Sequence, residues 1–176
     1  LLGSEFYAAQ PWLPLERAVA NFTMDVLQTA GPARDVVLVG AGQSELDELL
    51  RRAAARQSRT ITPDPRPERG LAFRADHFPF ARRGVPALLL MGMGGGHDLV
   101  NGGREAGDRW VAEFTGKCYH QACDRWSESW DLRGAAQDVT LVYQMASQLA
   151  NSRAWPQWHP GSEFKAVRDS AVAQRK

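Results

Sequence analysis

Four titratable side chains stand at places in the sequence where a metal site or a catalytic site could form: Asp25, Asp76, His77 and His120. Carboxylate oxygens and imidazole nitrogens bind zinc at about 2.0 to 2.2 Å, and the same groups serve as general acids and bases. Asp25 directly follows the apolar residues 18–24. A carboxylate at the end of a buried strand needs hydrogen bonds, an ion pair or a metal. Metal-assisted or hydrolytic chemistry is therefore one interpretation.

Each of these side chains also has a purely structural interpretation. Asp25 taken alone is more simply explained as a helix cap or one half of a salt bridge. Asp76 and His77 stand beside Phe78, and alone they suggest a helix cap and a buried, hydrogen-bonded histidine. No single residue decides between structure and chemistry.

Two cysteines flank His120, five residues apart, at Cys118 and Cys123. A zinc knot would need a second pair of ligands at short spacing, and the sequence contains no third cysteine. A cysteine nucleophile has no supporting spacing either. The pair could close a disulfide loop in an oxidising compartment or remain as two free thiols, and the sequence leaves both open.

The apolar pattern predicts strands that alternate with helices. Buried runs indicate strands at residues 18–24, 35–40, 60–62 and 85–91. Cap signals and helical spacing indicate helices at residues 44–57, with Ser44 as cap, 76–83 and 134–152. Pro-rich and Gly-rich residues indicate a loop at 63–70 and a flexible connection at 92–103.

These elements predict an α/β fold, a layered sheet with helices on both faces. Ligands of such sheets bind beyond the carboxyl ends of the strands. That rule directs attention to Asp25, to the loop before Asp76 and to the glycine-rich segment that leads to His120. His97 and Asp98, which end the glycine run, are expected at the surface, with an approach to the site on a mobile loop as the alternative.

Bulk composition excludes several classes of protein. The 176 residues carry a formal net charge of +1, and the basic residues are scattered, so no nucleic-acid interface is indicated. The longest apolar stretch, residues 85–93, is far shorter than the roughly twenty residues of a membrane-spanning helix. The later tryptophans, at positions 110, 126, 130, 155 and 158, are expected in the core, with a hydrophobic substrate pocket as the alternative.

Taken together, the motifs resemble the second half of the metallopeptidase family that contains bacterial leucyl aminopeptidases and glutaminyl cyclases. Four stretches carry the resemblance: Leu-Leu-Gly-Ser-Glu-Phe-Tyr at residues 1–7, Asn-Phe-Thr-Met-Asp at 21–25, Arg-Ala-Asp-His-Phe-Pro-Phe at 74–80 with Gly-Val-Pro-Ala at 84–87, and Tyr119-His120 with Asp124. It covers about residues 1–150 and implies a zinc-exopeptidase-like fold, of which this sequence would be the second half. The C-terminal residues 156–176 would form a tail beyond a domain at 1–155.

The resemblance implies an aminopeptidase that uses two zinc ions about 3.5 to 4 Å apart to hydrolyse N-terminal peptide bonds of a peptide substrate. Asp25 and His120 would each bind one zinc, whereas Asp76, His77 and Phe73 would contact the substrate or support the ligands. Phe73 stands where relatives often have tyrosine, so a phenol that supports the oxyanion is missing.

The family places its other ligands and its general-base glutamate before the position that corresponds to Leu1. The isolated chain is therefore expected to bind zinc poorly, to be inactive, and to associate with the missing N-terminal portion or as a homo-oligomer. A periplasmic or secreted location is favoured by the resemblance. A non-catalytic relative that serves recognition or assembly is the competing interpretation.

Overall fold

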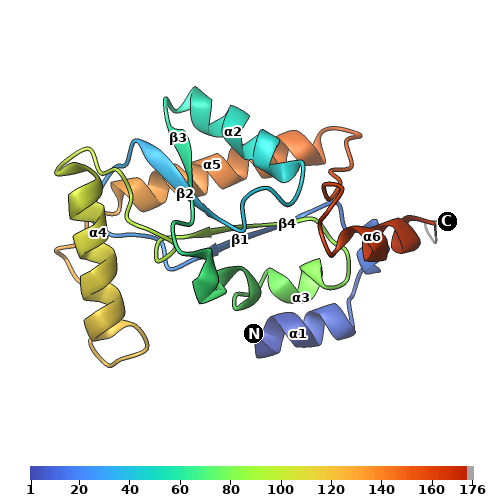
Figure 1. Ribbon diagram of the computed structural model, residues 1–176, viewed down its shortest axis with the longest axis horizontal. Helices are drawn as coiled ribbons and strands as arrows, with labels where there is room; N and C mark the ends of the chain where they lie inside the picture. Colours follow the sequence, from blue (N-terminus) through green and yellow to red (C-terminus); the bar gives the residue numbers. More distant parts are fainter. Residues whose placement is uncertain (174–176) are drawn as a thin grey trace.

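The computed structural model describes residues 1–173, and a four-stranded mixed sheet forms its centre (Figure 1). The strands are β1 (Asn21–Asp25), β2 (Asp35–Val39), β3 (Thr60–Pro63) and β4 (Ala87–Met91), in the spatial order β1-β4-β2-β3. β1 runs parallel to β4 and β2 parallel to β3, whereas β2 and β4 are antiparallel. All four predicted strands are present. Because β2 runs antiparallel to β4, the carboxyl ends of β1 and β2 lie at opposite ends of the strands in the sheet.

One face of the sheet is covered by α2 (Leu46–Arg56) and α5 (Arg133–Ala150) (Figure 1). The N-cap position of α2 is Glu45 and not the predicted Ser44, although Ser44 Oγ accepts a hydrogen bond of 3.3 Å from the N–H of Leu46. The apolar stripes of the two helices meet alternate residues of β2 and β4. The core on this face contains Val36, Leu38, Leu46, Leu50, Leu88, Leu90, Leu141 and Met145.

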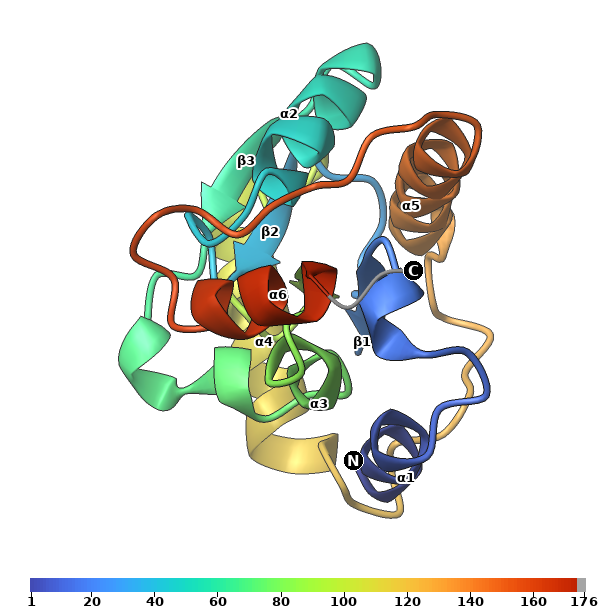
Figure 2. The same ribbon diagram turned by 90° about the vertical axis from the view of Figure 1, so that its right-hand side faces the viewer.

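The opposite face is covered by shorter elements: α1 (Leu2–Ala9), the 3-10 turns Leu15–Arg17, Pro67–Arg69 and Leu71–Phe73, and α3 (Phe78–Ala81). Figure 2 shows α1 and α3 below the sheet and α5 above it. The core on this side contains Val39, Leu71, Ala75, Leu89, Met91 and Met93. Helices therefore lie on both faces, and the predicted α/β layering is confirmed.

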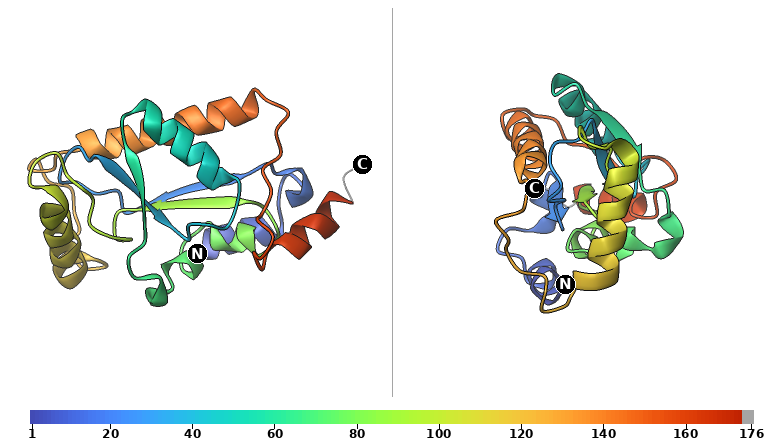
Figure 3. Two further views of the ribbon diagram at one scale, coloured as in Figure 1. Left: turned by 45° about the horizontal axis from the view of Figure 1, so that its top comes forward. Right: turned by 90° about the vertical axis from the view of Figure 1, so that its left-hand side faces the viewer.

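The prediction of a flexible connection at residues 92–103 is wrong, because residues 92–97 are buried. Their glycines permit close packing: a Cβ at Gly96 would overlap Asp108, and one at Gly107 would overlap the carbonyl of His97. His97 is only 3% exposed, so the prediction of a surface position is also wrong. The segment leads into α4 (Gly103–Glu113), which the sequence pattern did not indicate. Figure 3 shows α4 standing across one end of the sheet.

An ion pair lies in the same buried region. Arg59 and Asp138 are 2.7 Å apart, and their side chains are 2% and 4% exposed. Arg59 also donates to the backbone carbonyl of Asp35 at 2.6 Å. The pair therefore joins the loop before β3 to α5 in a place from which water is excluded.

The C-terminal residues fold back along the sheet and end in α6 (Lys165–Val172). Trp158 is 4% exposed, as expected of a core tryptophan, and its Nε1 donates to the carbonyl of Gly84 at 2.9 Å. Trp126 departs from that expectation, since it is 67% exposed. The division of the chain at residue 155 stays a prediction. None of the described helices is long and apolar enough to cross a membrane.

Candidate metal centre

Asp25 lies at the carboxyl end of β1, opposite Met91 of the parallel strand β4. The chain leaves both strands there, and the N–H of Gly92 donates to the carbonyl of Val26 at 2.8 Å. Val26 has a φ of 44°, so the backbone turns sharply just after the carboxylate. Asp25 is half-buried. It lies at the carboxyl end of its strand, where ligands of α/β sheets are expected to bind.

His120 is held at the tip of a loop that follows the π-helical turn Phe114–Cys118. A disulfide joins Cys118 to Cys123, which decides between the two alternatives that the sequence left open. The imidazole is exposed and stacks on the ring of Tyr119, with centroids 3.9 Å apart. A φ of 60° at His120 turns the backbone at this position. The loop therefore presents an imidazole on a covalently closed support.

Asp76 lies between α1 and the rest of the domain. Its Oδ1 accepts a hydrogen bond of 2.6 Å from Ser4 Oγ. The Ser4 hydrogen bond holds the pKa of Asp76 below its ordinary value. The carboxylate is therefore ionised and fixed near the start of α1.

These three side chains share one electrostatic environment. Burial raises the pKa of Asp25, and the charge of Asp76 raises it further, whereas His120 and the N–H of Val26 oppose the rise. Two carboxylates beside an imidazole would gain from a bound cation, which removes the repulsion between the carboxylates. Asp25 thus lies within electrostatic range of Asp76 and His120, although the three residues lie far apart in the sequence.

The donor types fit zinc, because carboxylate and imidazole are its common oxygen and nitrogen ligands. Asp25 and His120 each offer one donor of these types. Residues 1–173 contain no group of three or more His, Cys, Asp or Glu side chains arranged to hold a metal ion.

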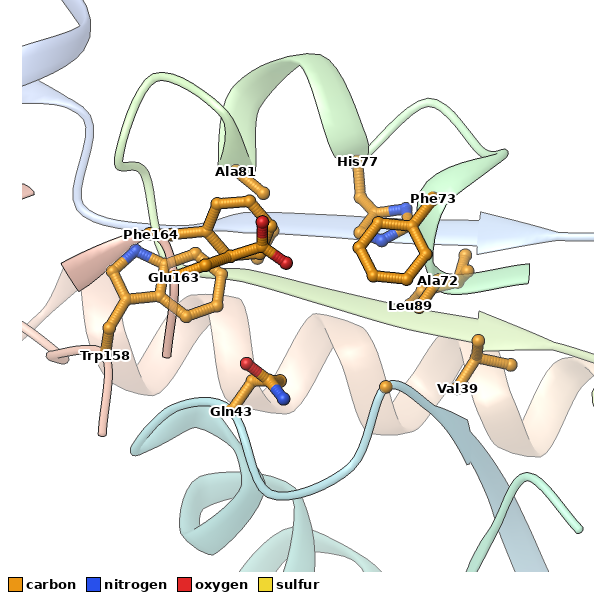
Figure 4. A pocket seen from close by; sticks show the side chains of 12 residues that line it. Val39, Gln43, Ala72, Phe73, His77, Ala81, Leu89, Trp158, Glu163 and Phe164 are labelled. Carbon is orange, nitrogen blue, oxygen red and sulfur yellow. The ribbon is translucent and has the colours of Figure 1, made fainter. Parts of the chain in front are cut away.

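Phe73 and His77 face a different pocket, seen in Figure 4. Phe73 packs edge-on against Phe78 at 5.4 Å. His77 is 7% exposed, and burial lowers its pKa to about 4 against the smaller opposing effects of the Ala72 carbonyl and the Asp76 charge. The adjacent residues Asp76 and His77 thus point in different directions: Asp76 contacts Ser4 of α1, and His77 lines the pocket.

A groove of about 760 Å³ is lined by Val26, the residue after Asp25, and by Cys118 and Cys123, whose disulfide closes the loop that carries His120. Asp25 and His120 themselves are not among its lining residues. Trp110 and Phe114 stack with centroids 5.4 Å apart, and Trp110 Nε1 donates to Thr29 Oγ1 at 3.1 Å. The groove is lined by Val26, Leu27, Thr29, Trp110, Glu113, Phe114, Lys117, Cys118, Cys123, Arg125, Trp126, Ser127 and Trp130.

Sequence reasoning did not place this groove, although one signal was available. Trp110 and Phe114 are four residues apart, the spacing that puts two side chains on one face of a helix. Three of the five later tryptophans line the groove. This agrees with the alternative interpretation, in which some tryptophans line a hydrophobic pocket.

Comparison with known proteins yields one match. The profile of peptidase family M28 matches residues 1–144 of the chain. No curated protein and no solved structure matches it. The matched region includes Asp25, Asp76 and His120 and ends inside α5, so residues 145–173 lie outside it.

Proposed function

The chain belongs to peptidase family M28, and on that premise we propose that it supplies part of the active site of a zinc-dependent aminopeptidase. The observation that supports the proposal is the electrostatic influence of Asp76 and His120 on Asp25 at the carboxyl end of β1, together with an aromatic groove that begins at Val26. Membership of the family indicates metallopeptidase activity. The preference for N-terminal residues and the use of two zinc ions are part of the proposal.

Asp25 and His120 would hold zinc, one ligand to each of two ions. When bound, zinc supplies a nucleophilic water at neutral pH and polarises the peptide carbonyl. Burial disfavours the ionised form of Asp25, so a metal would restore the charged carboxylate at that place. Asp76, fixed by Ser4, would orient the ligands or the substrate through its charge.

The groove would take the side chain of the substrate's first residue. Its walls combine indole and phenyl rings with aliphatic side chains, which favours an apolar group such as the side chain of leucine. Lys117 and Arg125 at its border carry positive charge and would attract the carboxylate end of a short peptide. The proposed substrate is therefore a peptide with an apolar N-terminal residue.

The remaining ligands and the general base would come from a segment outside this sequence, either in the same polypeptide or in another copy. Two features support a covering partner. β1 is an end strand of the described sheet, and α1 exposes apolar side chains, with Leu2 90% and Phe6 65% exposed. The isolated chain would then be inactive.

We also propose a periplasmic or secreted location. The disulfide between Cys118 and Cys123 supports it, because such bonds persist in oxidising compartments. A reducing environment would leave the loop that carries His120 without its covalent closure.

The proposal is tested on the longest form of the protein found in its source, by zinc analysis and by hydrolysis of leucine p-nitroanilide. Asp25→Asn and His120→Gln should each lower activity at least about a hundredfold and release zinc. Asp169→Asn and His159→Gln, matched changes away from the groove, should leave both near the original level. Full activity in Asp25→Asn would refute the assignment, and absence of zinc and activity in the unaltered protein would favour a recognition or assembly module.

A further inference from the structure

A second pocket, on the sheet face that carries α3, is closed by the C-terminal segment (Figure 4). It encloses about 70 Å³ between β2, β4, α3 and residues 158–164. Its lining residues are Val39, Gly40, Gln43, Ala72, Phe73, His77, Ala81, Ala87, Leu89, Trp158, Glu163 and Phe164. One wall therefore comes from residues beyond 144, outside the part of the chain that matches peptidase family M28.

The C-terminal wall is held firmly against the rest of the domain. The N–H of His159 donates to the carbonyl of Gln43 at 2.8 Å, and the N–H of Glu45 donates to the carbonyl of Gln157 at 3.0 Å. Trp158 is buried, and its indole N–H donates a hydrogen bond to the carbonyl of Gly84. The ring of Phe164 packs on that of Trp158 at 4.9 Å. The pocket is thus formed before any ligand arrives, which lowers the entropy lost on binding.

Three polar side chains face the enclosed space in Figure 4: His77, Gln43 and Glu163. His77 is more than nine-tenths buried, and its Nδ1 has no hydrogen-bond partner among the described residues. Glu163 forms no ion pair within residues 1–173. Each of these groups retains hydrogen-bonding capacity that a ligand could use.

The charge of the lining selects the class of ligand. Glu163 is the one acidic residue among the twelve that line the pocket, and none of them is lysine or arginine. Burial keeps His77 neutral at pH 7, since its pKa is about 4. The lining therefore carries one negative charge with no positive charge to offset it. An anion would be repelled, and a cation would be attracted.

The aliphatic and aromatic walls of the pocket determine which form of cation fits it. Val39 and Leu89 at the floor are aliphatic, and the rings of Phe73, Trp158 and Phe164 surround them. Aromatic faces attract ammonium groups, and aliphatic walls accept methylene groups. We propose that this pocket binds a small organic cation, a primary ammonium group on a short aliphatic chain, with the ammonium at Glu163 and Gln43 and the chain against Val39 and Leu89.

This proposal stands apart from the proposed peptidase function. The pocket borders Ala87 and Leu89 of β4, whereas Asp25 pairs with Met91 at the end of that strand. Leu89 is two residues of a strand from Met91, about 7 Å, and Ala87 is four residues away, about 13 Å. None of the pocket's lining residues is a proposed zinc ligand, so loss of binding here and loss of zinc are separate results.

The test is a titration with n-butylammonium chloride, followed by the NMR signal of the Trp158 indole N–H. Two probes of similar size control for charge: 1-butanol is neutral and butyrate is anionic. We expect a saturable shift with butylammonium and at least threefold weaker binding of both controls. Glu163→Gln should weaken butylammonium binding about threefold to fivefold, the effect of one partly exposed charge pair. Glu128→Gln, an exposed carboxylate elsewhere, should leave it unchanged.

Three results would overturn the proposal. The first is the absence of a saturable shift at millimolar butylammonium. The second is equal binding of butylammonium and 1-butanol, which would make the site merely apolar. The third is unchanged affinity in Glu163→Gln. Because Glu163 is exposed, that variant should unfold at the same temperature as the unaltered protein, so weakened binding cannot be assigned to loss of fold.

Discussion

Replacement of His77 by glutamine should reduce the sensitivity of the fold to acid. The pKa of His77 falls from 6.5 to about 4 on folding, chiefly because the ring is buried. Between these values the unfolded chain binds a proton that the folded protein refuses, so stability falls as the pH falls. The two pKa values imply a loss of about 2 kcal/mol between pH 7 and pH 5, and about 3 kcal/mol by pH 4.

The assay is urea unfolding, followed by tryptophan fluorescence, at pH 7 and pH 5 for the unaltered protein and for His77→Gln. Glutamine does not titrate, so the variant should lose about 2 kcal/mol less than the unaltered protein over this interval. Burial also lowers the pKa of His97, so part of the acid loss should remain in the variant. The two m-values should agree, which shows that unfolding exposes the same surface. Equal acid losses in both proteins, or a His77 imidazole that titrates near pH 6.5 by NMR, would refute the reasoning.

Three further predictions concern packing and covalent structure. Gly107→Ala should destabilise the fold by about 1 to 3 kcal/mol in thermal unfolding, because the new methyl group would overlap the segment before α4, whereas Gly116→Ala, with open space around it, should cost nothing. Asp138→Ala leaves its buried guanidinium partner without a counter-charge and should cost about 3 to 5 kcal/mol in urea; a loss below 1 kcal/mol would contradict the burial. Replacing Cys118 and Cys123 together by serine should cost about 2 kcal/mol, from the entropy of a six-residue loop, and unchanged stability would show that the bond is not formed.

The four strands could be predicted from the sequence because each is a short run of apolar or β-branched residues between turn signals. Their directions could not. Antiparallel pairing of Val39 with Leu89 depends on where the chain goes between β2 and β4, and no local pattern encodes that path. The carboxyl end of β1 therefore carries Asp25, whereas the carboxyl end of β2 lies at the other end of the sheet and adds no residue to this site.

The helices that sequence reasoning missed are those whose residues do not follow an apolar period. α4 contains Gly103 and Gly107, and glycine ordinarily disfavours a helix. Here Gly107 is required because the backbone of His97 passes against it. The same close approach explains why residues 92–97 are buried rather than mobile. A glycine-rich composition alone indicates flexibility, but here the glycines permit close packing.

The candidate site was predicted only in part, for a physical reason. Asp25 and His120 were predicted from motifs, and their positions depend on the parallel pairing of β1 with β4 and on the loop closed by the disulfide. The groove is built by Trp110 and its neighbours from α4 and the following loop, together with Val26, Leu27 and Thr29, which meet only in the folded chain. The pocket at His77 likewise depends on a C-terminal wall that has no local signature.

The most direct test of the proposed zinc site is anomalous diffraction at the zinc absorption edge, from crystals of the longest form of the protein isolated from its source. We expect two peaks about 3.5 to 4 Å apart, one within about 2.0 to 2.2 Å of an Asp25 carboxylate oxygen and the other at that distance from an imidazole nitrogen of His120. Peaks that lie elsewhere, or none near Asp25 and His120 in crystals that contain zinc, would contradict the assignment.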